Sequence, residues 1–172
     1  MEKRDLYDIN KKLTGETIYK DEKIPANRYI LVVLVFIQNS QGKFLIQKRS
    51  KQKDGKFAST GGHPKTGETS IDGMITEIKE ELGLTVKPEE LELIYSGRED
   101  LEHVFFDIYY MKKNFNIADL TLQKEEVESV EWLSFGEIED LIEKNLFLES
   151  HAEEVYRLKE IFKKRGVNID EK

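Results

Sequence analysis

The sequence predicts an α+β fold in which helices cover a mixed, partly antiparallel β-sheet. Short apolar stretches rich in β-branched residues recur along the chain, and three longer segments carry apolar residues at helical spacing. No internal repeat, low-complexity stretch or Pro/Gly/Ser-rich linker interrupts these segments. We therefore expect residues 1–172 to form a single domain, because this length lies in the usual single-domain range.

Strands are expected where apolar residues concentrate. Residues 29–37 form a nearly continuous apolar run, which is typical of a strand covered on both faces. The turn-forming residues 39–42 then predict a hairpin with a second strand at 44–47. Residues 1–27 are expected to form an N-terminal β extension. Its two strands are expected at 6–9 and 16–19, and the remaining strands of the sheet at 91–96, 104–111 and 127–133.

Three helices are expected at residues 70–82, 135–144 and 151–165, the last lying within a C-terminal segment 150–166. The first has marked ends, since Thr69 and Asp72 can cap its start and Gly83 can adopt the left-handed conformation that ends a helix. The apolar stripe of the last helix requires burial, either against the sheet or in a homodimer.

Composition excludes several classes of function. With 34 acidic and 27 basic residues, the net charge of −7 argues against a nucleic-acid polymer as partner. No apolar run is long enough to cross a bilayer and no secretory pattern opens the sequence, so we expect a cytoplasmic protein without a membrane partner. The absence of cysteine removes thiol nucleophiles, thiolate metal ligands and disulfides.

The first helix carries the main chemical signal. Glu77, Glu80 and Glu81 lie together beside its apolar stripe, because offsets of three and four residues share one helix face. Such like-charge pairs cost about 0.2–0.5 kcal/mol each without a counter-charge. Most acidic helix faces are simply solvated, but a hard divalent cation would also relieve this repulsion.

Glycines surround this helix in a pattern that favours a site. Gly61, Gly62 and Gly67 flank the segment that leads into it and permit tight turns and close approach of a ligand. Gly73 lies inside the helix, where glycine costs roughly 0.5–1 kcal/mol, so close packing is expected there.

Residues 62–84, GHPKTGETSIDGMITEIKEELGL, resemble the Nudix box. One position departs, since Thr76 stands where the family has an arginine that orients the neighbouring carboxylates. Residues 30–49 are similar to the segment before the box in Nudix proteins related to isopentenyl-diphosphate isomerase, and the resemblance extends over residues 28–145. The box positions that agree are Gly62, Glu68, Glu77, Ile78, Glu80, Glu81, Gly83 and Leu84.

The resemblance implies a Nudix-like α/β/α sandwich and a divalent-metal-dependent hydrolase that cleaves a diphosphate linkage in a small molecule. The ion would be Mg²⁺ or Mn²⁺, and metal-activated water would attack phosphorus. The implied ligands are Glu77, Glu80, Glu81 and the carbonyl of Gly62, supported by Gly61 and Glu68. The catalytic base stays open between Glu77 of the box and Glu126, or its neighbour Glu125.

Two basic residues are expected to contact the diphosphate. Arg49 lies in a basic run that also contains Lys48, Lys51, Lys53 and Lys56, and Lys65 lies in the glycine-rich approach. The sequence leaves open whether a lysine or arginine from elsewhere, for instance Lys79 or Arg98, restores the charge that Thr76 lacks.

Two other functions compete with hydrolysis. Thr76 motivates a ligand-binding or regulatory Nudix-fold module with little or no catalysis, although the retained glutamates favour the enzyme. An isopentenyl-diphosphate isomerase would need a catalytic cysteine, and this chain has none. The sequence leaves the substrate open between a nucleoside diphosphate linked to another moiety and related diphosphates.

Overall fold

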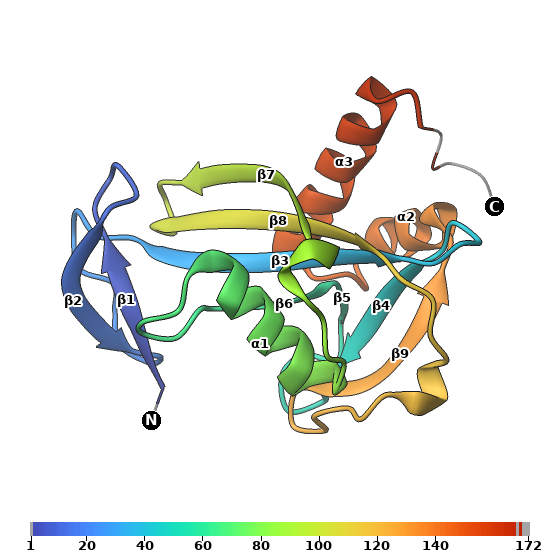
Figure 1. Ribbon diagram of the computed structural model, residues 1–172, viewed down its shortest axis with the longest axis horizontal. Helices are drawn as coiled ribbons and strands as arrows, with labels where there is room; N and C mark the ends of the chain where they lie inside the picture. Colours follow the sequence, from blue (N-terminus) through green and yellow to red (C-terminus); the bar gives the residue numbers. More distant parts are fainter. Residues whose placement is uncertain (1, 168, 170–172) are drawn as a thin grey trace.

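The computed structural model describes residues 2–167 and 169 and contains two β-sheets with three α-helices (Figure 1). The N-terminal ribbon pairs β1 (Lys3–Tyr7) with β2 (Leu13–Tyr19). The larger sheet contains β3 (Ile30–Gln38), β4 (Phe44–Arg49), β5 (Phe57–Ala58), β6 (Thr60–Gly62), β7 (Glu92–Glu99), β8 (Val104–Lys112) and β9 (Val127–Leu133). The helices are α1 (Ser70–Leu82), α2 (Phe135–Glu143) and α3 (Glu149–Lys164), with 3₁₀ turns at Pro88–Glu90 and Ile117–Asp119.

The larger sheet is mixed, as expected, but the predicted hairpin is only partly correct. β3 runs parallel to β8 and antiparallel to β6, and it meets β4 at the single pair Gln38–Phe44. The two strands separate after their turn because β4 pairs instead with β9 and β5. β5 and β6 were not predicted, since segments of two and three residues are too short to show a periodicity.

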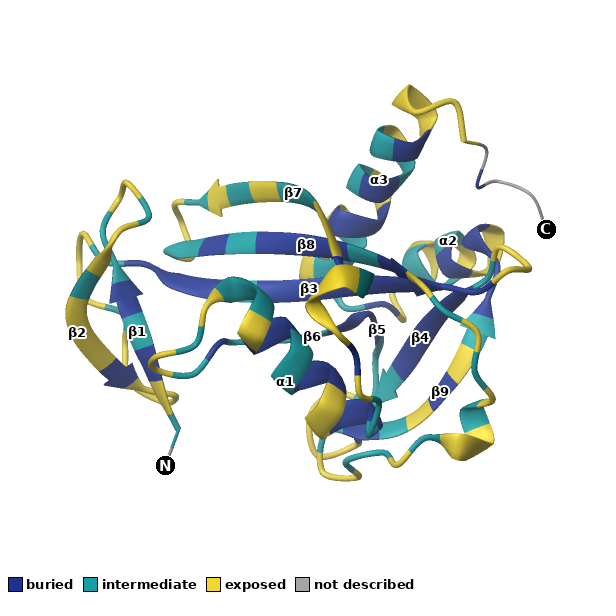
Figure 2. Ribbon diagram, in the orientation of Figure 1, coloured by how far each residue is buried: buried dark blue, intermediate teal, exposed yellow. Residues whose placement is uncertain are grey.

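β3 forms the centre of the fold and is buried on both faces, as its apolar run predicts. Val33 and Val35 belong to the core that contains Met74 and Ile78 of α1. Leu34 and Phe36 face the opposite core, to which α2 and α3 contribute. Figures 1 and 2 show β3 almost fully buried between α1 on one side and the C-terminal helices on the other. This arrangement is the α/β/α sandwich that the resemblance implied.

The helix ends follow local chemistry. Thr69 Oγ1 accepts a hydrogen bond from the Asp72 N–H at 3.3 Å, and Gly83 has φ 69° with its N–H donating to the Lys79 carbonyl. α3 begins at Glu149, two residues earlier than expected. Its stripe of Val155, Leu158 and Phe162 is buried within this chain, so the stripe does not require a homodimer.

The ribbon is held against the rest of the fold by backbone hydrogen bonds. Tyr7 and Tyr29 exchange two of them, at 2.9 and 3.0 Å, which ties β1 to the start of β3. The Lys3 carbonyl accepts from the Thr66 N–H at 3.0 Å, which ties β1 to the segment that precedes α1. Within the described residues, none of the helices combines the length and apolar character needed to span a bilayer.

Candidate active site

Two glutamates of α1 are buried beside the glycines of β6. Glu77 is 8% exposed and Glu81 is 6% exposed. A Cβ atom placed on Gly62 would lie 2.3 Å from the Glu77 carboxyl carbon, far below van der Waals contact. A larger residue at Gly62 would therefore displace the Glu77 carboxyl group from this position. The sequence predicted close approach of a ligand at these glycines, and the structure shows close approach of Glu77.

Burial changes the proton affinity of both carboxyl groups. Loss of solvent, together with the negative charge of Glu80, raises the pKa of Glu77 to about 7. Loss of solvent and the charge of Glu77 raise the pKa of Glu81 to about 8. Glu81 accepts a hydrogen bond from Gln47 Nε2 at 3.2 Å, while Gln47 Oε1 accepts from the Thr60 hydroxyl at 3.1 Å. Gln47 is thus fixed from both ends and orients Glu81.

Glu68 and Glu80 are bound by other residues of the box. Glu80 is 43% exposed at its side chain and pairs with Lys65 Nζ at 2.8 Å. Glu68 accepts from the Lys65 N–H at 2.7 Å and from the Thr76 hydroxyl at 2.6 Å. Thr76 therefore orients a box carboxylate by a neutral hydrogen bond, and the cation that pairs with Glu80 is Lys65.

Neither Lys79 nor Arg98, the two residues considered as sources of the missing charge, contacts the box glutamates. Lys79 Nζ donates to the Thr85 hydroxyl at 3.1 Å, and Arg98 pairs with Asp100 at 2.8 Å. Both side chains are engaged away from Glu77 and Glu81, because Lys79 lies on the exposed side of α1 and Arg98 lies near the end of β7.

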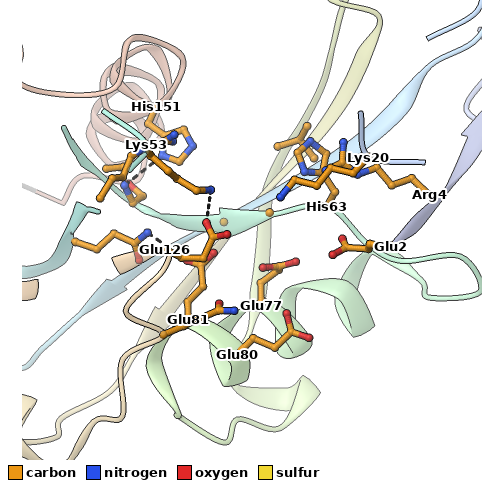
Figure 3. Close-up of a pocket in the computed structure, with 18 residues that line it drawn as sticks. Glu2, Arg4, Lys20, Lys53, His63, Glu77, Glu80, Glu81, Glu126 and His151 are labelled. Carbon is orange, nitrogen blue, oxygen red and sulfur yellow. Dashed lines mark hydrogen bonds and ion pairs between the residues drawn. The ribbon is translucent and has the colours of Figure 1, made fainter. Parts of the chain in front are cut away.

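The carboxylates open into a pocket of about 230 Å³. Figure 3 shows Glu77, Glu80 and Glu81 between two basic regions, with Lys53 and His151 on one side and Arg4, Lys20 and His63 on the other. The side chains and glycines that line the pocket include Glu2, Arg4, Lys20, Gln47, Arg49, Lys53, Ser59, Gly61, Gly62, His63, Glu77, Glu80, Glu81, Gln123, Glu126 and His151.

One end of the pocket is formed by the loop after β4 and by the start of α3. Arg49 pairs with Asp54 at 3.0 Å, and Lys53 forms an ion pair with Glu126. His151 Nδ1 accepts a hydrogen bond from the Ser59 N–H at 3.2 Å. Burial and the charge of Arg49 lower the pKa of His151 to about 4, so this imidazole is neutral at pH 7.

The other end of the pocket is formed by the N-terminal ribbon and by His63. Arg4 of β1 is 9% exposed, and Lys20 directly follows β2. Burial, followed by the charges of Arg4, Lys20 and Lys53, lowers the pKa of His63 to about 3. His63 is therefore neutral and lies in a region of positive potential.

The donor chemistry of the pocket fits a hard divalent cation. Glu77 and Glu81 present carboxylate oxygens beside the backbone of Gly61 and Gly62, and oxygen ligands are those that Mg²⁺ and Mn²⁺ prefer. Among the described residues, the Glu77 carboxylate has no ion-pair or hydrogen-bond partner. Glu77 and Glu81 are therefore two buried acids that lie together with no cation of the described chain paired with either. No three acidic or histidine side chains of the described residues converge at metal-ligand spacing, so a third acidic ligand would have to move.

The structure brings most of the predicted site residues together. The pocket is lined by Arg49, Gly61, Gly62, Glu77, Glu80, Glu81 and Glu126. Three others lie outside its lining as described: Lys65, Glu68 and Glu125. Lys65 contacts Glu80 and Glu68 instead of facing the pocket. Sequence reasoning missed Arg4, Lys20, Gln47, His63 and His151 as site residues. Among the pocket residues that were not predicted as site residues, only Lys53 had a signal in the sequence, because it lies in the basic run that contains Arg49.

Comparison with known proteins agrees with the fold and the box. Residues 28–158 match the NUDIX domain family. An uncharacterized Nudix hydrolase of Listeria monocytogenes is 37% identical over 145 residues, which cover 82% of this chain and 85% of that protein. The chain therefore belongs to the Nudix family. Together the family match and such relatives support its class as a pyrophosphohydrolase.

Two solved structures share the fold. A crystal structure of a Deinococcus radiodurans protein superposes with a TM-score of 0.76 at 23% identity, covering 91% of this chain and 98% of that one. The NUDIX domain of Shewanella oneidensis NrtR, solved with ADP-ribose, gives a TM-score of 0.59 at 16% identity, covering 83% and 92% of the two chains. At these identities the likeness concerns the fold alone.

Proposed function

We propose that this Nudix hydrolase cleaves the diphosphate linkage of a small molecule, such as a nucleoside diphosphate joined to another moiety, with bound Mg²⁺ or Mn²⁺. The observation that carries the proposal is the burial of Glu77 and Glu81 beside Gly62 without a cation of the chain bound to either. Nudix hydrolases generally use divalent metals, which agrees with this donor set. The ADP-ribose bound to a protein of the same fold gives an example of such a diphosphate.

Glu77, Glu80, Glu81 and the carbonyl of Gly62 would hold the ion, with Gly61 and Glu68 supporting them. A bound divalent ion neutralises diphosphate oxygens and lowers the pKa of coordinated water. Glu80 must leave its ion pair with Lys65 to become a ligand. Because Lys65 contacts Glu80 directly and Glu68 through its N–H, its movement would affect both carboxylates.

Glu77 and Glu126 are the two proposed bases, and they differ in how readily each can accept a proton. Glu126 is paired with Lys53, so this ion pair must open before Glu126 can reach water or metal. Glu77 has no such pair within the described chain and already lies against Gly62. Either base would take the proton of the attacking water while the P–O bond to a phosphate ester breaks. Lys53 and Arg49 would then lie near the substrate phosphates.

The test is Glu81→Gln, assayed with Mg²⁺ or Mn²⁺ on nucleoside di- and triphosphates, nucleotide sugars, dinucleotides and prenyl diphosphates. We expect turnover to fall more than about 100-fold, because loss of even an outer-shell partner of a metal ligand costs roughly 10–100-fold. The amide keeps the shape of Glu81 and its neighbour Gln47, so folding should be retained. Glu131→Gln, at an exposed position of β9, serves as the control and should hydrolyse at the rate of the unmodified chain.

Each other outcome has a definite meaning. Equal turnover by the Glu81→Gln variant and the unmodified chain would refute the proposed metal site. No turnover of any substrate by the unmodified chain, together with tight binding of one of them, would favour the ligand-binding module instead.

A further inference from the structure

Arg4 occupies a buried strand position, where an apolar side chain is usual. Alternate residues of a strand face the same side, and Arg4 and Leu6 are the two buried residues of β1. Leu6 packs with Ile18 and Ile30 in a small core under the ribbon. Arg4 instead brings a guanidinium into the pocket that contains the box glutamates.

The charge of Arg4 is not satisfied by the described chain. Its Nε is buried without a hydrogen-bond partner, and none of the described carboxylates forms an ion pair with it. Glu2 and Glu77 are near enough to favour the charged form of Arg4, but neither contacts it at ion-pair distance. A buried, unpaired cation destabilises a fold, and a ligand of opposite charge would relieve that cost.

Hydrogen bonds of the residues on both sides of Arg4 fix its place in the backbone. The Lys3 carbonyl accepts from the Thr66 N–H, and the Asp5 carboxylate accepts from the Gly67 N–H, both at 3.0 Å. These bonds join β1 to the segment that immediately precedes Glu68. Arg4 is therefore held rigidly relative to the box, as a ligand-binding side chain requires.

Lys20 adds a second cation at the same end. It follows β2 directly, lines the pocket and forms no side-chain ion pair or hydrogen bond with the described residues. Arg49 and Lys53, at the opposite end, are paired with Asp54 and Glu126. The ribbon end thus carries the two unpaired cations of the pocket.

The described lining of the pocket is mainly charged and polar. None of these residues is Phe, Tyr or Trp, the large aromatic side chains on which nucleobases often stack. Charge therefore dominates recognition at this pocket.

We propose that Arg4 and Lys20 form a phosphate subsite that binds a phosphate group of the substrate other than the diphosphate cleaved at the glutamates. The substrate class is then a diphosphate that carries a further phosphate. This assignment of the substrate rests on the proposed function. The ribbon lies before the residues that match the family, so this subsite belongs to the extension of the chain.

Binding can be tested without catalysis. We would titrate sodium tripolyphosphate by calorimetry, in the presence of EDTA, into the full chain and its Arg4→Gln and Lys20→Gln variants. Arg4→Gln should weaken binding about tenfold or more, because charge-assisted hydrogen bonds to phosphate are lost. Lys12→Gln, an exposed lysine of the same ribbon, should bind as the unmodified chain does. Unchanged affinity in Arg4→Gln overturns the proposal.

Two further variants separate binding from folding. Arg4→Met removes an unpaired buried charge and should keep or raise Tm, and Arg4→Lys should regain part of the affinity. If Arg4→Lys binds as weakly as Arg4→Gln, or if Arg4→Met lowers Tm, the residue is structural and the subsite is refuted.

The substrate class is tested with NADPH and NADH, which differ by one phosphate. Arg4→Gln should reduce kcat/KM for NADPH more than for NADH and so bring the two values together; an equal reduction for both overturns the further-phosphate assignment. Failure of the proposed function can be told apart from failure of the subsite. Tripolyphosphate binding in EDTA needs no metal or hydrolysis, so the Glu81→Gln variant should still bind tripolyphosphate even if the chain hydrolyses no substrate.

Discussion

Thr76 is the residue at which this chain departs from the box, and the structure assigns it a contact. Its hydroxyl donates to Glu68 Oε2 at 2.6 Å, while the Lys65 N–H donates to the other oxygen at 2.7 Å. Glu68 is held by two neutral donors instead of an arginine fork. The hydrogen bond from Thr76 preserves the orientation of Glu68 but places no positive charge beside Glu77.

Thr76→Val should therefore reduce turnover by roughly 10-fold, the lower range for loss of a partner that orients metal-site residues. Valine keeps the shape of threonine and removes the donor, so Glu68 would be held by the Lys65 N–H alone. Thr76→Ser restores a hydroxyl and should recover most of the activity. Steady-state kinetics on the substrate found in the screen would measure both, and equal rates for Val and Thr would refute a role for this hydrogen bond.

At the scale of elements, the packing of α1 against the segment before it determines where the carboxylates lie. A Cβ atom on Gly73 would come within 2.6 Å of Pro64 Cγ and 2.9 Å of Pro64 Cα. The predicted close packing at Gly73 is thus confirmed, and its partner is Pro64. Gly62 leaves room for the Glu77 carboxyl group, so a glycine of α1 and a glycine of β6 both contribute to the position of the carboxylates.

Gly73→Ala should destabilise the protein although alanine is the better helix former. Alanine gains roughly 0.5–1 kcal/mol of helix propensity, but overpacking of this kind costs typically about 1–3 kcal/mol. Gly136→Ala in α2 is the matched control, because its Cβ would meet its nearest neighbour, Ser134 Oγ, at 4.0 Å. Urea unfolding should show a loss of stability for Gly73→Ala and a gain for Gly136→Ala. A gain for both would show that Pro64 moves aside freely.

At the scale of the whole molecule, buried ionisable groups link stability to pH and to metal. The raised pKa values of Glu77 and Glu81 mean that the folded chain binds these protons more tightly than the unfolded chain does. Their stabilisation is complete below the usual value of 4.5 and is lost as pH rises through about 7 and about 8. The lowered pKa values of His63 and His151 act oppositely, removing stability as pH falls below 6.5.

Above pH 6.5 His63 and His151 no longer change the stability with pH, and only Glu77 and Glu81 of these four groups still do. Tm in EDTA should therefore fall between pH 6.5 and about pH 8. Mg²⁺ should raise Tm, and the increase should grow with pH because the ion replaces protons on the same carboxylates. Thermal unfolding with EDTA or Mg²⁺ at several pH values would measure this. Glu81→Gln should flatten the EDTA profile and respond less to Mg²⁺. A metal response that does not vary with pH would contradict the linkage.

Features that depend on local geometry could be predicted from the sequence. The grouping of Glu77, Glu80 and Glu81, the capping of α1 at Thr69 and its end at Gly83 all follow from helical periodicity and backbone preference. Most strands and the three helices were predicted for the same reason, with errors of a few residues at their ends.

The residues that complete the pocket could be identified only from the folded chain. Arg4, Lys20 and His151 lie far from the box in sequence, and strand pairing and helix docking bring them to it. The short strands β5 and β6 were missed because two or three residues have no period to detect. The carboxylate site is thus encoded within one helix, whereas the charges that face it depend on long-range packing, which a single sequence does not reveal.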